Sequence, residues 1–86
     1  MKLIFCPHCE DVVKLKREKT FCACKKCWGQ YKEDGLHASI NKEAIPLGFS
    51  NPTLAEALYL RPAGGLGSRF EAFVIPIQCP TIEVEK

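Results

Sequence analysis

The sequence predicts a small, β-rich α+β domain in which short antiparallel strands are joined by turns and accompanied by one short helix. Three observations carry this prediction. Cysteines gather in two groups near the N-terminus, several short segments are rich in β-branched and aromatic residues, and a single segment has the signals that begin a helix. At 86 residues the chain is long enough for one domain, although a core of this size is only marginally stable by itself.

We expect residues 1–86 to form that one domain in three parts. A cysteine-rich ribbon covers residues 1–32, strands and the short helix cover residues 33–78, and a tail covers residues 79–86. Within the ribbon, an apolar strand leads into the first cysteine group, a second strand with one polar face follows, and a return strand begins at Thr20. We expect the second strand and the return strand to pair as a hairpin, which brings the two cysteine groups together.

The spacing of the cysteines suits one shared metal ion. Cys6 and Cys9 are separated by two residues, so that a tight turn can present both thiols to one ion. The second group offers three cysteines for the two remaining places. Cys24 and Cys27 repeat the two-residue gap, whereas Cys22 and Cys24 are two apart and face the same side of an extended strand. The spacing leaves both arrangements open, and Cys24 belongs to each.

Two cysteine groups with this spacing indicate a tetrahedral metal site with four thiolate ligands. Disulfides are the alternative use of the six cysteines, but they need an oxidising compartment. The apolar run at the N-terminus is too short for a secretion signal, so we expect a cytoplasmic protein with reduced thiols. We therefore expect one Zn²⁺ per chain, which contributes to folding directly. Iron is the alternative metal, because four thiolates suit both ions.

The cysteine turns resemble those of zinc-ribbon and rubredoxin-like proteins. The whole chain also resembles a sparsely characterised group of small bacterial and phage-associated zinc-ribbon proteins, which brings no known activity with it. The matching segments are Cys6-Pro7-His8-Cys9, Asp11-Val12, Cys22-Ala23-Cys24, Gly29-Gln30-Tyr31 and Asp34-Gly35. Where the group has a glycine after its second cysteine pair, this chain has Lys25. The resemblance implies that Cys22 completes the site in preference to Cys27, so that the metal ligands are Cys6, Cys9, Cys22 and Cys24.

Further strands follow the ribbon. Residues 28–32 and residues 36–40 predict a pair of strands, joined by a hairpin turn at Asp34-Gly35. Residues 44–49 are apolar, and Pro46 confines them to an edge or an irregular strand.

The helix has clear start and stop signals. Asn51 is a suitable N-cap, Pro52 suits the first helical position, and Pro62 ends the helix. Its apolar residues predict a stripe buried against the rest of the domain: Leu54, Ala57, Leu58 and Leu60. The glycine-rich segment Gly64–Ser68 lacks the lysine of a phosphate-binding loop, so we expect a flexible connection. Residues 69–75 then give the clearest strand pattern of the chain.

Charge is unevenly distributed along the sequence. Residues 1–32 carry eight Lys/Arg against three Asp/Glu, a balance of +5, and residues 33–86 carry four against seven, a balance of −3. The basic side chains that could meet an anionic partner are Lys14, Lys16, Arg17, Lys25 and Lys26. Phe21, Trp28 and Tyr31 could stack on bases beside them if they are exposed. For Phe21 and Trp28 we expect burial in the core instead.

These observations favour a binding or adaptor module, for a protein or a nucleic acid, over an enzyme. The only histidines, His8 and His37, belong to no recognisable catalytic motif, and a four-cysteine site leaves no position for a reacting water. The alternative function is a redox or small-molecule-handling protein that uses an iron site or the remaining thiols, Cys79 among them. No segment is long and apolar enough to span a membrane.

Overall fold

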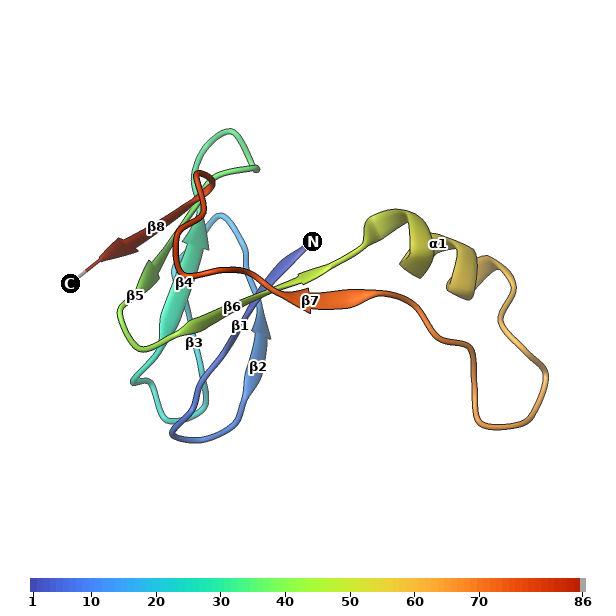
Figure 1. Cartoon of the computed structure of the whole chain (residues 1–86). Coiled ribbons are helices and arrows are strands. Elements are labelled where there is room, and N and C mark those ends of the chain that lie inside the picture. The colour runs from blue at the N-terminus through green and yellow to red at the C-terminus, as the bar shows by residue number, and fades with distance from the viewer. Residues whose placement is uncertain (86) are drawn as a thin grey trace.

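The computed structural model describes residues 1–85 and contains two β-sheets of four strands each and one α-helix (Figure 1). The elements in chain order are β1 (Lys2–Phe5), β2 (Val12–Lys14), β3 (Thr20–Phe21), β4 (Trp28–Tyr31), β5 (Ala38–Asn41), β6 (Ile45–Phe49), α1 (Asn51–Tyr59), β7 (Ala72–Val74) and β8 (Ile82–Glu85). The prediction of a small, β-rich α+β domain with one short helix is confirmed.

Most strands pair antiparallel with a neighbour. The first sheet has the order β2-β1-β6-β7, and all its pairs are antiparallel. The second sheet has the order β3-β4-β5-β8, in which only the β5–β8 pair is parallel. Strand β1 of the first sheet lies against β4 of the second. The core is therefore enclosed between the two sheets.

A few fully buried apolar side chains form that core. Ile4 from β1, Leu15 after β2 and Ile40 from β5 are its largest members. Along β5 the alternation of a strand places Ala38 and Ile40 inside, whereas Ser39 is only partly buried. The core reaches the buried thiols of the cysteine groups, so packing and the candidate metal centre share one interior.

Gly29 of β4 lets the two sheets come close together. A Cβ atom at this position would lie 2.4 Å from the Cδ2 atom of Leu15 and 3.4 Å from the Cγ2 atoms of Ile4 and Ile40. The missing side chain therefore leaves the space that Leu15 fills.

Each cysteine group forms the turn of its own hairpin. The N–H of Cys6 donates to the carbonyl of Asp11 at 3.0 Å, and the N–H of Cys22 donates to the carbonyl of Cys27 at 3.0 Å. Strand β2 consequently pairs with β1, and β3 pairs with β4. The expected pairing of the second strand with the return strand is wrong, because each turn folds the chain back onto the strand that precedes it.

The aromatic residues of the ribbon are less buried than expected. Phe21 is 45% exposed, so the expectation that it belongs to the core is wrong. Strand β3 has only two residues at the edge of its sheet, and Phe21 lies on its outer side. Trp28 is partly buried, and the ammonium group of Lys19 lies 4.1 Å from the centroid of its ring.

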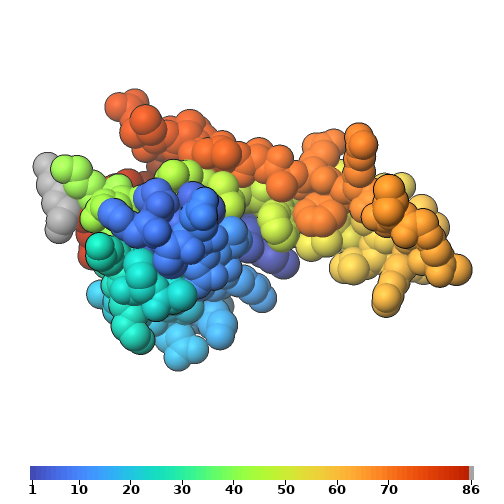
Figure 2. All heavy atoms as spheres, turned by 90° about the horizontal axis from the view of Figure 1, so that it is seen from below, coloured from blue at the N-terminus to red at the C-terminus, as the bar shows by residue number. Residues whose placement is uncertain are grey.

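Residues 50–71, which we call the arm, stand away from the two sheets. Strand β6 leads out of the body into α1, and the chain returns through β7 (Figure 1). The space-filling view shows the arm, in yellow and orange, extending beyond the body (Figure 2). No residue of α1 is buried, so the expected buried stripe on the helix is wrong. The direction in which β6 leaves the body places the helix out of reach of the core.

Hydrogen bonds at its base fasten the arm. Ser50 occupies the N-cap position in place of the expected Asn51, whose side-chain oxygen accepts a hydrogen bond from the N-terminal amine at 2.9 Å. The N–H of Ser50 donates to the carbonyl of Glu71, and the N–H of Glu71 donates to Oγ1 of Thr53, both at 2.9 Å. The base of the arm is therefore held, while its helix faces solvent.

The last two strands differ from the sequence expectations. Within the strand expected over residues 69–75, only β7 forms, and all three of its residues are exposed. Within the expected tail, residues 82–85 form β8, which pairs parallel with β5 from Ala38 opposite Ile82 to Asn41 opposite Glu85. Among residues 1–85, no helix combines the length and apolar character that crossing a membrane requires.

Candidate metal centre

Four thiols meet where the two cysteine turns approach each other. The Sγ atoms of Cys6, Cys9, Cys22 and Cys24 all lie within 4.8 Å of one another. The Sγ atom of Cys24 is 3.7 Å from that of Cys6 and 3.5 Å from that of Cys22. All six cysteines are free thiols in the structure. The first turn supplies two members of the cluster and the second supplies the other two.

The separation of the sulfur atoms fits a tetrahedral metal ion. With metal–sulfur bonds of about 2.3 Å, the sulfurs of a tetrathiolate site lie about 3.8 Å apart. The separations of Cys24 from Cys22 and from Cys6, 3.5 and 3.7 Å, are close to that value. A bound ion therefore requires only small movements of these side chains.

The cluster lies at the boundary between core and solvent. Cys6 and Cys22 are buried, Cys9 is partly buried and Cys24 is exposed. The two leading cysteines of the turns therefore anchor the cluster in the core. The exposed thiol of Cys24 leaves one side of the cluster open for an ion to enter.

The protein surroundings favour negative charge on part of the cluster. Burial opposes ionisation of Cys22, but a 3.4 Å hydrogen bond from the N–H of Cys27 and the neighbouring thiols outweigh it and lower the pKa of Cys22 to about 6. Burial likewise opposes ionisation of Cys6, yet the N–H groups of Cys9 and His8 give it a lowered pKa. The backbone thus stabilises thiolates at this position.

The thiol of Cys24 resists ionisation when no cation is present. The N–H of Lys26 favours the Cys24 thiolate, but burial and the neighbouring thiols prevail and raise the pKa of Cys24 to about 12. Four thiolates so close together repel one another. A divalent cation at the centre removes that repulsion, so the chemistry of the donor set fits a bound metal.

Cys27 stands outside the cluster although it belongs to the second cysteine group. Its thiol is fully buried in the core, where burial, and then the neighbouring Cys6, raise the pKa of Cys27 to about 11. Its carbonyl closes the second turn by accepting the N–H of Cys22. In this chain Cys27 therefore packs as a small apolar residue, and the structure brings Cys22 into the cluster in its place.

The residue that follows each cysteine pair adopts a left-handed backbone conformation. Glu10 after Cys9 has φ 59°, and Lys25 after Cys24 has φ 66°. Left-handed φ values favour glycine, because a Cβ atom is crowded there. The two turns thus share the same backbone conformation at this position. Glycine would relieve the strain there, but this chain has Glu10 and Lys25.

Two polar side chains that the sequence analysis did not single out hold the turns in place. The carboxylate of Asp11 in the first turn accepts a hydrogen bond from the N–H of Ala23 in the second, at 2.9 Å. The side-chain amide of Asn41 donates to the carbonyl of Lys26 at 3.0 Å and accepts from the N–H of Trp28 at 2.8 Å. The only sequence signal for either residue was the Asp11-Val12 pair of the resemblance.

Two other residues of interest lie outside the cluster. The imidazole of His8 is exposed, and its Nε2 contacts the carboxylate of Glu43 at the surface. The thiol of Cys79 lies 3.3 Å from the hydroxyl of Thr81, and this contact holds the pKa of Cys79 below its ordinary value. Neither residue is part of the four-cysteine cluster.

The basic residues of the ribbon do not form one patch. Lys25 and Lys26 lie in the second cysteine turn, beside the cluster. Lys16 and Arg17 lie at the other end of the ribbon, where the N–H of Tyr31 donates to the carbonyl of Lys16 at 2.7 Å. Lys14 lies between them on β2, opposite Leu3 of β1. The five expected cationic residues are therefore spread along the length of the ribbon.

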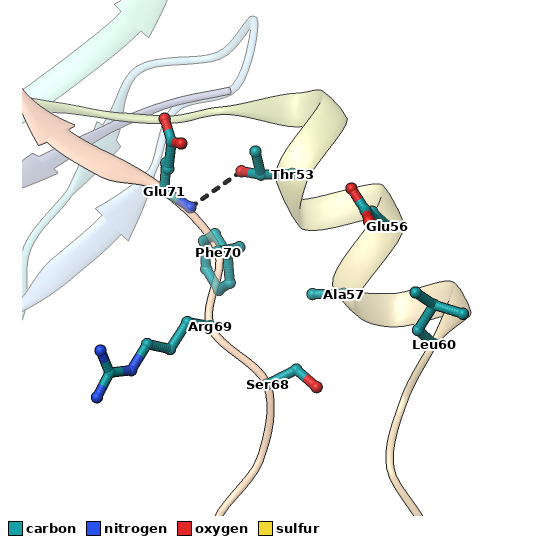
Figure 3. A pocket seen from close by; sticks show the side chains of 8 residues that line it. All are labelled: Thr53, Glu56, Ala57, Leu60, Ser68, Arg69, Phe70 and Glu71. Atoms are coloured by element: carbon teal, nitrogen blue, oxygen red, sulfur yellow. Dashed lines mark hydrogen bonds between the residues drawn. The ribbon is translucent and has the colours of Figure 1, made fainter.

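The arm encloses a hollow of about 500 Å³ between α1 and the returning segment 68–71. Figure 3 shows Ala57 on the inner side of the helix facing the segment that carries Ser68 and Phe70. The ring of Phe70 meets that of Phe49 edge-on, with centroids 5.0 Å apart, and the hydroxyl of Thr53 holds the returning backbone. These few contacts leave the helix loosely packed, and no charged side chain in the hollow is buried.

No family model, no curated protein and no solved structure shows a significant match to the chain. The resemblance to zinc-ribbon proteins therefore rests on the residues of the cysteine turns. The described residues contain a four-cysteine cluster that is compatible with binding a metal ion.

Proposed function

We propose that the chain binds one structural Zn²⁺ ion through Cys6, Cys9, Cys22 and Cys24, as a zinc-ribbon module. The observation that carries the proposal is the mutual distance of their four Sγ atoms, all within 4.8 Å. Their separations match a tetrahedral tetrathiolate site, in which zinc is stable and has no redox chemistry. The N–H groups directed at Cys6 and Cys22 support their ionisation as ligands.

The role of the ion is to join the two hairpins. Each cysteine turn is closed by only two backbone hydrogen bonds, and the core beside the cluster is small. Structural zinc sites in small domains contribute about 10–16 kcal/mol of apparent binding free energy to folding at neutral pH. Such a contribution exceeds the ordinary stability of a domain of this size.

Metal analysis of the purified chain tests this part of the proposal. Expressed in a reducing cytoplasm, the protein should contain one zinc per chain and have no visible absorption. A red or brown protein with one iron per chain would support the alternative redox function instead. A chain that is folded without metal, and that takes up neither ion on titration, would refute both.

We further propose that the zinc-stabilised module acts by binding a macromolecular partner. A tetrathiolate site has no open coordination position, so it does not offer the metal to a substrate. The exposed lysines of the ribbon favour a nucleic acid, whereas the exposed apolar residues of the arm favour a protein. Because the basic residues are spread along the ribbon instead of forming one patch, the protein partner is the better supported of the two.

Titration with duplex and single-stranded DNA and RNA at two salt concentrations separates these partners. A nucleic-acid-binding ribbon should lose affinity with a log–log slope of about −0.7 to −0.9 per phosphate contact. Replacing Lys16 and Arg17 by Glu should then abolish binding. No binding at low salt would leave the protein partner.

A further inference from the structure

The chain exposes more surface than a folded monomer of its mass should. Its accessible surface is 6259 Å², whereas a monomeric protein of 9.6 kDa exposes about 5,100 Å². Its radius of gyration is 14.1 Å, against about 12 Å for a compact domain of 86 residues. The excess area, about 1,200 Å², is comparable to what each partner buries in a standard interface, about 800 Å².

The arm extends beyond the body and exposes large apolar side chains (Figure 2). Leu58, Tyr59, Leu60 and Leu66 are each more than 60% exposed. The helix α1 has nine residues and buries none of them. Isolated helices shorter than about 12–15 residues are marginal in water, so packing against another surface must stabilise this one.

A complementary surface exists on the body of the same chain. An apolar groove of about 620 Å³ opens between the edge strands β7 and β8. Exposed aliphatic side chains line it, among them Ile45, Val74, Ile77 and Val84. We call this surface the groove.

The arm cannot occupy the groove of its own chain. The groove lies at the Ile45 end of β6, whereas the arm leaves from the Phe49 end of the same strand. The β6–β7 pairing, with Phe49 opposite Ala72, fixes that direction of exit. Figure 1 accordingly shows the arm pointing away from β8. The groove can therefore receive an arm only from another molecule.

The fit between the two surfaces is apolar, because neither carries a net charge. Within the arm, Arg61 and Arg69 are balanced by Glu56 and Glu71. Among the residues that line the groove, Lys42 and Glu43 balance each other. The acidic residues of β8 alternate with the side chains that line the groove. An arm in the groove therefore brings apolar side chains together without placing a net charge on either side.

We propose that two copies of this chain associate by reciprocal exchange, with the arm of each copy lying in the groove of the other. Both surfaces are present once per chain, so one two-fold axis satisfies both arms and both grooves and leaves none free for further growth. The excess area per chain agrees with such an interface. The inference is independent of the metal's identity, but it rests on the proposed protein partner, which it identifies as a second copy of this chain.

The association state of the full chain tests the proposal. Light scattering after gel filtration at micromolar concentration should give a mass of about 19 kDa, twice the 9.6 kDa of one chain. The variants Leu58→Asp in the arm and Ile77→Asp in the groove should each raise the dissociation constant roughly thirtyfold or more, because a charge would be buried in both contacts. Both side chains are largely exposed in the single chain, so neither change disturbs its fold. Leu36→Asp, a leucine 54% exposed outside both surfaces, is the matched control and should remain dimeric.

Mixing the two variants distinguishes reciprocal exchange from other dimers. In a mixed dimer, the Leu58→Asp chain offers an intact groove and the Ile77→Asp chain offers an intact arm, so one of the two contacts is restored. The mixture should therefore dimerise more tightly than either variant alone, which a size tag on one chain makes visible. Loss of dimer with Leu58→Asp but not with Ile77→Asp would show that arms pack on arms and overturn the proposal. A monomeric wild-type chain would also overturn it and assign the arm to a different protein.

Discussion

The carboxylate of Asp11 accepts a hydrogen bond from the backbone N–H of Ala23 at 2.9 Å. This contact joins the first cysteine turn to the second, and Ala23 lies between Cys22 and Cys24. A carboxylate that fixes the backbone between two ligands orients both of their side chains. Asp11 thus positions the candidate metal centre without being one of its ligands.

Replacing Asp11 by Ala should weaken zinc binding by about 10–100-fold, the usual effect of losing an outer-shell contact. Competition with a chromophoric chelator at fixed pH measures the change. Asp11→Asn keeps an oxygen acceptor for the N–H of Ala23 and should recover most of the affinity. Equal losses in the two variants would mean that the charge of Asp11, and not its hydrogen bond, matters.

Single Ala replacements should separate the ligands from the spare thiols. Loss of Cys22 or Cys24 should remove the metal and the cooperative unfolding transition together, because metal binding and folding are coupled. Cys27→Ala should retain one zinc per chain and cost only about 1–2 kcal/mol of stability through a small core cavity. Zinc content and thermal unfolding are the measurements. A metal-free Cys27→Ala beside a metal-loaded Cys22→Ala would reverse the assignment.

Glycine at position 25 should stabilise the protein. Lys25 has φ 66°, and a left-handed conformation costs an L-residue about 1–2 kcal/mol, partly offset by the greater chain entropy of glycine. The expected gain for Lys25→Gly is about 0.5–1 kcal/mol in denaturant unfolding of the metal-loaded chain. Lys26→Gly, at a neighbouring position without positive φ, should instead destabilise. If the Lys25→Gly variant is less stable than the parent chain, the lysine side chain itself must stabilise the folded state.

An added methyl group at position 29 should be poorly tolerated. The Cβ atom of Gly29→Ala would lie 2.4 Å from Leu15, which is itself fully buried, so the sheets must move apart. Overpacking of this kind typically costs about 1–3 kcal/mol. Gly64→Ala in the arm is the control, since no atom lies within 4 Å of its added Cβ. Equal unfolding midpoints for the two variants would contradict the close approach of the sheets.

Local signals in the sequence predicted most of the elements. The helix was expected where α1 forms, because Pro52 and Pro62 are local start and stop signals. The turn at Asp34-Gly35 also follows from its residues, since Gly35 has φ 67° and the N–H of His37 donates to Asp34. Such features depend on neighbours in the chain alone.

Features that depend on distant residues were missed. The helix pattern cannot reveal that β6 leads α1 away from the core, so the burial of Leu58 was expected wrongly. The alternation of Ile82 and Val84 with Glu83 and Glu85 is a local strand signal that the expectation of a charged tail overlooked. The parallel pairing of this strand with β5 depends on residues far away in the chain and could not be predicted.

The candidate site was predicted in part. The first cysteine turn follows from its spacing, but the choice between Cys22 and Cys27 does not. That choice depends on which residue closes the hairpin, and the carbonyl of Cys27 takes this role by accepting the N–H of Cys22. The cluster agrees with the set that the resemblance implies, and ligation of a metal by that set stays a prediction.

The parallel pairing of β8 with β5 also orders the events of chain synthesis. All four cysteines of the cluster lie before β4, so the metal centre can assemble while only the two N-terminal hairpins have left the ribosome. The second sheet must wait, because its edge strand follows the entire arm in the chain. Closing so long a loop between β5 and β8 costs more conformational entropy than closing a hairpin does. In a nascent chain the four thiols can therefore come together while the groove between β7 and β8 does not yet exist.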